Sequence, residues 1–191
     1  MEHAEPTSAD LSAAIRRGDE AVFSRLVREH QQSVFFMALR MGRGDEALAR
    51  DIVQKSFLAA WRNRKSFRGD ASFRTWVLRI ARNQCLNELG RAWRTREQGG
   101  KDIEAHRPRD EPNDNNPLAR LLRGEARTLV EQAVATLPTR QRSVATLRLY
   151  DDLSFAEIAE VCEITTNNAK VSFHHAVRNI RQFLVKQGVA A

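Results

Sequence analysis

The sequence has little of what extracellular, membrane-spanning and metal-binding proteins are built from. Among 191 residues there are two cysteines and one tyrosine, and the longest uninterrupted apolar run, residues 34–39, has six members. A membrane helix needs roughly 20 apolar residues, so we expect no membrane span. Residues 1–10 lack the basic start and apolar middle of a secretory signal. We therefore expect a cytoplasmic protein.

Neither cysteine belongs to a pattern that binds metal or forms disulfides. Cys85 and Cys162 are far apart in the sequence, and no C-x-x-C or clustered histidines accompany them. Such patterns mark zinc sites and disulfide frameworks. We expect both thiols to be buried and free, with no metal and no cofactor. His174 and His175 are adjacent on a predicted helix, where neighbours point about 100° apart and cannot chelate together.

The charge of the chain is basic and local. Lysine and arginine number 31 against 24 acidic residues, which gives a net charge of +7. Residues 62–96 contain ten basic side chains and only Asp70 and Glu88 as acids. Clustered cations displace counterions from a phosphate backbone. This segment therefore predicts nucleic-acid binding, with a solvated basic helix face as the alternative.

Helical periodicity runs through almost the whole chain, and no stretch alternates as a half-buried strand does. A polar segment rich in glycine, proline and asparagine interrupts it, which is typical of a tether between domains. We therefore predict an all-α protein with two small helical domains joined by a flexible linker. The predicted parts are a disordered tail (1–9), a first domain (10–95), the linker (96–117) and a second domain (118–187).

Three segments of the first domain read as helices with identifiable ends. Residues 10–41 predict a short helix and then a long one, interrupted around residues 17–19, where a glycine stands. A further long helix precedes the linker. Asp70 or Ser72 can cap its start, and Gly90 is expected to end it.

The second domain has sharper local signals. Pro138 is expected at the first position of a helix, where its missing N–H costs nothing. Ser154 followed by Glu157 forms a capping box that opens a short helix. A longer helix follows, capped by Thr165 or Thr166. A short helix, a tight turn and a longer helix form the helix-turn-helix arrangement, whose second helix enters the DNA major groove. Short helical hairpins also occur for packing reasons alone.

Two motif sets, in this order, resemble the extracytoplasmic-function (ECF) sigma factors, the smallest type of bacterial promoter-specificity subunit. The first set is DIVQKSFLAAW at residues 51–61 and FRGDASFRTW at residues 67–76. The second is LPTRQR at residues 137–142 and LSFAEIA at residues 153–159. The resemblance implies sigma domain 2 and sigma domain 4. It also implies a protein that binds core RNA polymerase, directs it to specific promoters and helps open the minus-10 region, without catalytic residues of its own.

The helix around residues 51–61 looks like the family's docking surface for the clamp helices of the largest polymerase subunit. Asp51 and Gln54 are one turn apart and share a face, which suits recognition of a basic helical hairpin. For Phe57 and Trp61, plain core packing is the alternative. The candidate polymerase-binding residues are Asp51, Gln54, Lys55, Phe57 and Trp61.

The loop at residues 67–73 and the helix after it look like the family's reader and opener of the minus-10 element. Opening DNA requires a cationic groove for the single strand and a place to hold an extruded base. Trp76 offers a stacking surface or belongs to the core. The candidate residues are Arg68, Ser72, Phe73, Arg74, Trp76, Arg79, Arg82, Asn83 and Asn87.

The helix from Thr165 to Arg178 looks like the recognition helix for the minus-35 element, read as intact duplex. It departs from the family, which usually carries arginines in the middle of this helix. Asparagine can pair with adenine and valine can touch a thymine methyl, whereas few cations mean few phosphate contacts. The candidate residues are Thr165, Thr166, Asn167, Asn168, Lys170, Val171, His174, His175 and Arg178.

Two other classes of function compete with this interpretation. A stand-alone helix-turn-helix regulator would bind duplex DNA without polymerase, but it has no use for the first motif set. A nuclease needs converging carboxylates, and Asp151 and Asp152 lie in a turn that helix entry already explains. The resemblance also implies an anti-sigma factor as partner. It implies a location in the bacterial cytoplasm, on the nucleoid when active, and no small-molecule substrate or membrane insertion.

Overall fold

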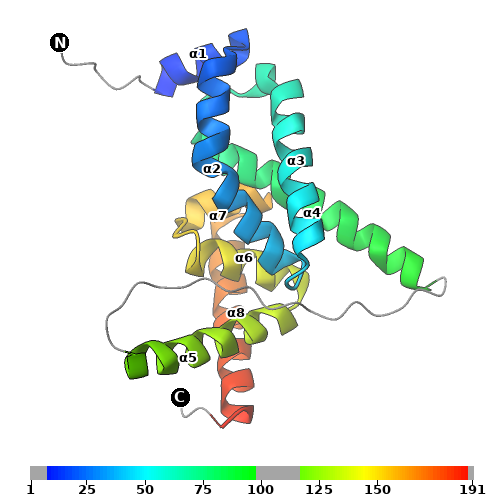
Figure 1. Cartoon of the computed structure of the whole chain (residues 1–191), viewed down its shortest axis with the longest axis vertical. Coiled ribbons are helices and arrows are strands. Elements are labelled where there is room, and N and C mark those ends of the chain that lie inside the picture. Colours follow the sequence, from blue (N-terminus) through cyan, green and yellow to red (C-terminus); the bar gives the residue numbers. More distant parts are fainter. Residues whose placement is uncertain (1–7, 98–116, 189–191) are drawn as a thin grey trace. The chain divides into compact units, whose positions relative to one another are not determined.

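A computed structural model of the chain describes the backbone of residues 8–97 and 117–188 and the side chains of residues 9–91 and 127–188. Within these residues it contains eight α-helices, one 3-10 helix and no strand (Figure 1). The all-α prediction is confirmed. The predicted tail and linker lie almost entirely outside the described residues.

The first motif set lies on the third and fourth α-helices of the chain and on the loop that leads into the fourth. A break between the first two helices falls at Gly18, whose φ of 83° is left-handed. Asp19 then caps the next helix, because its Oδ1 accepts a hydrogen bond from the Val22 amide at 3.0 Å. The predicted interruption is confirmed. The bounds are α1 (Ser8–Arg17), α2 (Glu20–Met41), α3 (Glu46–Arg62), η1 (Arg64–Ser66) and α4 (Phe73–Glu97).

The start of α4 agrees with the sequence prediction, and its end does not. Ser72 is the cap, since its Oγ accepts a hydrogen bond from the Thr75 amide at 3.0 Å. The predicted end at Gly90 is wrong, because the helix continues to Glu97. Glycine in a helix costs roughly 1 kcal/mol relative to alanine, which weakens a helix without ending it.

Aromatic rings from α2, α3, α4 and the loop before α4 form one buried cluster. Phe23 contacts Trp61 at 4.9 Å and Phe73 at 5.9 Å between ring centroids. Phe67 contacts Trp76 at 5.0 Å, and Trp76 contacts Phe73 at 5.8 Å. Tilted and edge-on pairs of this kind contribute beyond the area they bury. The cluster therefore fixes the loop at residues 67–72 against three helices.

The second motif set lies on α6 (Thr139–Leu149), on α7 (Phe155–Cys162) and on the residues just before each of them. The helices α5 (Pro117–Thr136) and α8 (Thr166–Lys186) precede and follow it. Pro138 is the N-cap of α6, one position earlier than predicted. Apolar side chains from α5, α6 and α8 and from the turn after α5 pack into one core. Its members are Ala133, Val134, Leu137, Ala145, Ala176 and Ile180.

The helix-turn-helix is built by local hydrogen bonds. Ser154 Oγ accepts from the Glu157 amide at 3.2 Å, and Glu157 Oε2 accepts from the Ser154 amide at 2.8 Å. Glu163 ends α7 in the left-handed region, with φ of 54°. Thr165 caps α8, because its Oγ1 accepts from the Asn168 amide at 3.1 Å. The capping box is confirmed, and Thr165 is the cap of the two threonines.

The chain divides into two compact units. One comprises residues 1–38 and 47–101, and the other comprises residues 39–46 and 102–191. The short segment 39–46 thus groups with the second unit, whereas the sequence assigned it to the first domain. The domain boundaries stay a prediction. Among the described helices, none has the length and apolar character needed to cross a membrane.

Candidate functional site

The solvent face of α3 is a stripe of residues four positions apart. Arg50, Gln54, Leu58 and Arg62 are exposed, and Asp51 beside them is half-buried. Leu58 is 46% exposed and is the large apolar side chain of this stripe. Sequence reasoning missed Leu58, although its place one turn after Gln54 could have indicated it.

The two aromatic docking candidates, Phe57 and Trp61, pack against the core. Phe57 is 7% exposed and lies on the buried side of α3 with Ile52 and Ala60. Trp61 is half-buried, and its ring packs against Phe23. Both aromatic residues therefore pack in the core, which is the alternative that the sequence left open. Phe57 is too buried to contact a partner directly.

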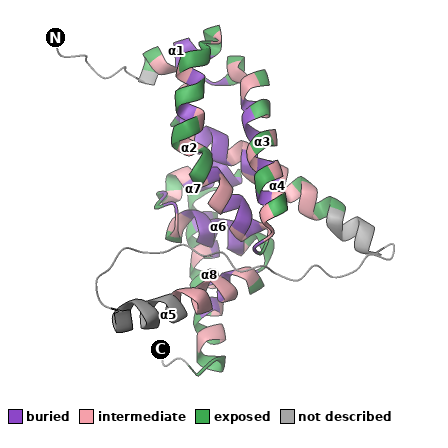
Figure 2. Cartoon of the chain, in the orientation of Figure 1, coloured by how far each residue is buried: buried purple, intermediate pink, exposed green. Residues whose placement is uncertain are grey.

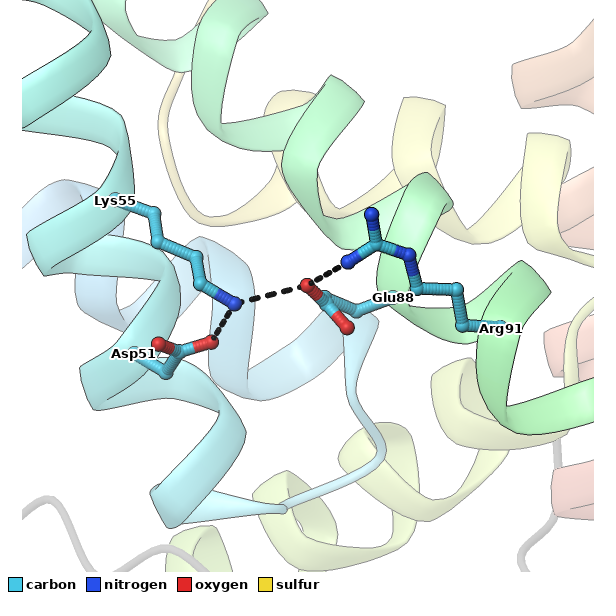
Figure 3. A network of polar contacts seen from close by, with 4 residues as sticks. All are labelled: Asp51, Lys55, Glu88 and Arg91. Carbon is cyan, nitrogen blue, oxygen red and sulfur yellow. Dashed lines mark hydrogen bonds and ion pairs between the residues drawn. The ribbon is translucent and has the colours of Figure 1, made fainter. Parts of the chain in front are cut away.

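A chain of four alternating charges joins α3 to α4 (Figure 3). Lys55 Nζ donates to Asp51 Oδ2 at 2.6 Å and to Glu88 Oε1 at 2.9 Å. Arg91 Nη1 donates to the same Glu88 oxygen at 3.1 Å. Hydrogen bonds to Asp51 and then to Glu88 raise the pKa of the Lys55 ammonium. Lys55 is thus a charged bridge between the two helices.

Two predicted minus-10 residues are part of the core. Trp76 is 6% exposed and Phe73 is 3% exposed, and both lie in the aromatic cluster. The stacking-surface interpretation of Trp76 is therefore wrong in this structure, since the ring is covered by Phe67 and Phe73. Its physical role is to hold the loop in place.

The polar candidates on α4 share one face. Arg79, Asn83 and Asn87 succeed one another at four-residue intervals, so they lie in one row along the helix. Arg82 borders this row and donates from Nη1 to Asn83 Oδ1 at 3.3 Å. Asn87 is exposed, whereas the other three are half-buried. The row, named here the α4 row, consists of Arg79, Asn83 and Asn87.

The cations before and at the start of α4 have different surroundings. Arg68, in the loop, is exposed. Arg74 is half-buried, and its Nη2 donates to Ser33 Oγ on α2 at 3.3 Å. Ser72 is exposed, but its hydroxyl is engaged as the cap of α4. Of these three, Arg68 is the side chain best placed to meet a phosphate.

His30 of α2 adjoins the loop, and sequence reasoning missed it. Its ring stacks on Phe73, with centroids 5.7 Å apart and planes 29° from parallel. Burial lowers the pKa of His30, Glu29 opposes this and Arg74 lowers it further. The imidazole is therefore held in its neutral form, as an aromatic partner of the loop. Nothing in the sequence around residue 30 indicated this contact.

Nearly all the minus-35 candidates lie on the solvent face of α8. His175 is half-buried and the others are exposed, with Val171 at 46%. The opposite face is buried through Ala169 and Ala176, while Phe173 packs on Phe155 of α7 at 5.7 Å. Among the residues with described side chains, no three of His, Cys, Asp or Glu gather as metal ligands.

Comparisons with known proteins agree with this arrangement. Residues 26–95 match the family "Sigma-70 region 2", and residues 127–180 match "Sigma-70, region 4". The chain is 32% identical to the RNA polymerase sigma-H factor of Pseudomonas aeruginosa over 169 residues, which cover 84% of this chain and 86% of that protein. It is 31% identical to the ECF RNA polymerase sigma-E factor of Escherichia coli over 191 residues, covering 95% and 97%.

Two solved structures show the same fold. The sigma factor RpoE from Bartonella quintana, in complex with the anti-sigma factor NepR, has a TM-score of 0.71 at 18% identity and covers 85% of this chain and 96% of that one. CnrH, in complex with the cytosolic domain of CnrY, has a TM-score of 0.66 at 24% identity and covers 94% and 99%. The chain belongs to the Sigma-70 family and is an ECF sigma factor, a transcription initiation factor that directs RNA polymerase.

Proposed function

We propose that this sigma factor divides its work among three surfaces. The stripe on α3 docks onto the clamp helices of the largest polymerase subunit. The α4 row and the loop before it capture and open the minus-10 element, and the exposed face of α8 reads the minus-35 element as duplex. The observation that carries the proposal is that each surface consists of exposed or half-buried residues on a helix whose opposite face is buried.

Docking on α3 centres on Leu58. Protein interfaces place apolar anchors at the centre and polar groups around them. Leu58 is the exposed apolar side chain here, with Gln54 one turn before it and Asp51 one turn further. The carboxylate of Asp51 gives the surface a group that complements a basic hairpin.

Opening by α4 relies on amides and cations in one row. Side-chain amides can pair with the edges of an unstacked base, and arginine can follow the backbone phosphates. Asn83 and Asn87 supply the amides, Arg79 supplies positive charge in the same row, and Arg68 supplies it from the loop before α4. Trp76, seven residues before Asn83 on the same side of α4, is buried.

Reading by α8 depends on few charges. Its exposed candidates include only two cations, Lys170 and Arg178. Sequence-independent affinity grows with the number of phosphates neutralised, so this unit alone is expected to bind DNA weakly. Asn167 and Val171 can instead supply base contacts. A reader with weak intrinsic affinity suits a polymerase subunit better than a stand-alone regulator.

Regulation and place of action follow from the same surfaces. The two solved relatives are complexes with an anti-sigma factor and with the cytosolic domain of CnrY. An anti-sigma factor that covers the α3 stripe or the α8 face would silence this protein. The protein then acts in the cytoplasm, on the nucleoid when bound to polymerase, without catalytic residues or a cofactor of its own.

Reconstitution tests the proposal. Purified protein is mixed with bacterial core RNA polymerase, and co-elution and run-off transcription are measured on a promoter library. Binding together with new, sequence-defined start sites is the expected result. Binding to duplex DNA without association with polymerase would leave the stand-alone regulator as the better account.

A further inference from the structure

The helix α4 is packed against the core in its first part and is less buried toward its C-terminal end. The side chains of Phe73, Val77, Ala81 and Cys85 are buried at intervals of four residues. Among residues 86–91, which follow, none is buried. Figure 2 shows intermediate and exposed residues over this outer part of the helix. Asn83 is thus near the last anchoring point, and Asn87 lies beyond it.

Glu88 is where this outer part is attached to another helix. Its carboxylate oxygen Oε1 accepts from Lys55 of α3 at 2.9 Å and from Arg91 at 3.1 Å. Its side chain is 20% exposed, compared with 42% for Lys55, 43% for Asp51 and 67% for Arg91. Glu88 is therefore the least solvated member of the network, where water screens an ion pair least.

The network connects two surfaces that have separate proposed tasks. On α3, Lys55 holds the carboxylate of Asp51 at 2.6 Å, beside the docking stripe. On α4, Glu88 is the neighbour of Asn87 in the sequence and holds the segment that carries it. The four charges alternate in sign and sum to zero, so the chain gains attraction at each link without accumulating net charge.

We infer that Glu88 is a positioning residue, which through Lys55 sets the outer part of the α4 row relative to the docked α3 surface. The inference rests on the proposed function of these two surfaces. Lys55 then acts as the bridge between two carboxylates and orients Asp51. A bound polymerase would present the row to the DNA in a defined place only while this link holds.

The test uses Glu88→Gln in the full-length protein, with Glu131→Gln as matched control. Glu131 is 18% exposed and also pairs with an arginine of its own helix, Arg127, at 3.4 Å. Open-complex formation is measured by permanganate reactivity of minus-10 thymines at saturating core polymerase, so that docking affinity does not enter. Because a partly exposed ion pair contributes little, we expect Glu88→Gln to slow opening about two- to five-fold.

Three further measurements separate positioning from loss of structure. The thermal midpoint of Glu88→Gln should stay within a few degrees of wild type. Lys55→Met should slow opening to a similar extent, and the double variant should be no slower than the slower single variant, because both changes break one link. Additive losses in the double variant would count against the link.

Asn83→Ala, assayed in parallel, distinguishes this inference from the proposed function. If Asn83→Ala impairs opening while Glu88→Gln behaves like Glu131→Gln, the positioning role is overturned and the α4 row stands. If both Asn83→Ala and Glu88→Gln open promoters like wild type, the row and its positioning are both overturned.

Discussion

Two helices of this protein are proposed to touch DNA, and they differ in how they are built. In α4 the aromatic candidates Phe73 and Trp76 are buried, and the polar row lies beside them. In α8 the candidates lie on a face with little burial, backed by small residues such as Ala169 and Ala176. Opening DNA requires a rigid support for strained single strands, whereas reading a duplex groove requires only an exposed helix face.

The difference shows that residue type does not indicate which side chain meets the ligand. Trp76 has the chemistry to stack on a base, yet its ring supports the loop from within. Val171 has no hydrogen-bonding group in its side chain, yet it is exposed on α8, the helix proposed to read the minus-35 element. Burial decides between the two roles.

The largest effect is expected for Trp76→Ala. Removing a buried aromatic ring costs about 3–5 kcal/mol of unfolding free energy, because it leaves a cavity among Phe67 and Phe73. Val171→Ala, the control on α8, should change the unfolding free energy by about 0.5 kcal/mol or less. Chemical denaturation followed by circular dichroism measures both.

Each unit contains one free buried cysteine, Cys85 in α4 and Cys162 in α7, so thiol alkylation reports which part opens. Burial raises the pKa of Cys85 to about 12, which keeps it unreactive in the folded unit. Trp76→Ala should accelerate alkylation of Cys85 and leave Cys162 unchanged. Equal acceleration at both thiols would show that the two units do not open independently.

A second effect concerns docking. Asp51→Arg reverses the charge beside the α3 stripe and also repels Lys55, so we expect affinity for core polymerase to fall about ten-fold or more. Glu20→Arg, an exposed acid at the start of α2, is the control and should have little effect. Affinity is measured by fluorescence anisotropy of labelled protein. Unchanged affinity of Asp51→Arg would return this face of α3 to a purely structural role.

A third effect concerns opening. Asn83→Ala removes one amide from the α4 row, and a lost hydrogen bond of about 1 kcal/mol corresponds to roughly five-fold slower opening. Gln84→Ala removes an amide from the next position, which points about 100° away from the row. Permanganate footprinting at saturating polymerase compares the two. Equal loss in both variants would contradict the idea of a single reading row.

A fourth and smaller effect concerns base reading. If Val171 touches a thymine methyl, Val171→Ala should lower transcription about two- to four-fold, as expected for the loss of buried methyl contacts. Replacing minus-35 thymines by uracil should have the same effect on wild type and none on the variant. Val185→Ala is the control, since Val185 is 55% exposed near the end of α8.

The smallest effect is expected from His30. Its pKa is lowered in the folded state mainly by burial, so the neutral imidazole contributes stability that is present above the usual value of 6.5 and is lost as the pH falls through the lowered pKa. His30→Phe keeps an aromatic ring on Phe73 without a titrating group. Its unfolding midpoint should fall less than that of wild type on acidification. Parallel acid profiles of the two proteins would contradict this role.

Local features of the fold were predictable from sequence, because they depend on neighbouring residues. The capping box of Ser154 and the break at Gly18 are set by contacts within a few positions. The predicted end at Gly90 failed because glycine lowers helix propensity without by itself stopping a helix.

Features that depend on how helices pack could not be predicted. The helical periodicity of the sequence is compatible with Trp76 in the core and with Trp76 facing a ligand. Only the positions of Phe67 and Phe73 show that the ring is buried. Leu58 was overlooked because a leucine is by default assigned to the core. The bond between Lys55 and Glu88 joins positions 33 residues apart, and sequence spacing does not give the register of α3 against α4.

The most direct test of the division of labour is run-off transcription with core polymerase on a library in which both promoter elements are randomised. We expect Asn83→Ala to change the selected minus-10 sequences and to leave the minus-35 sequences as in wild type, and we expect Val171→Ala to do the reverse. If both variants altered the same element, or if the protein produced no defined start sites, the assignment of opening to α4 and reading to α8 would be contradicted.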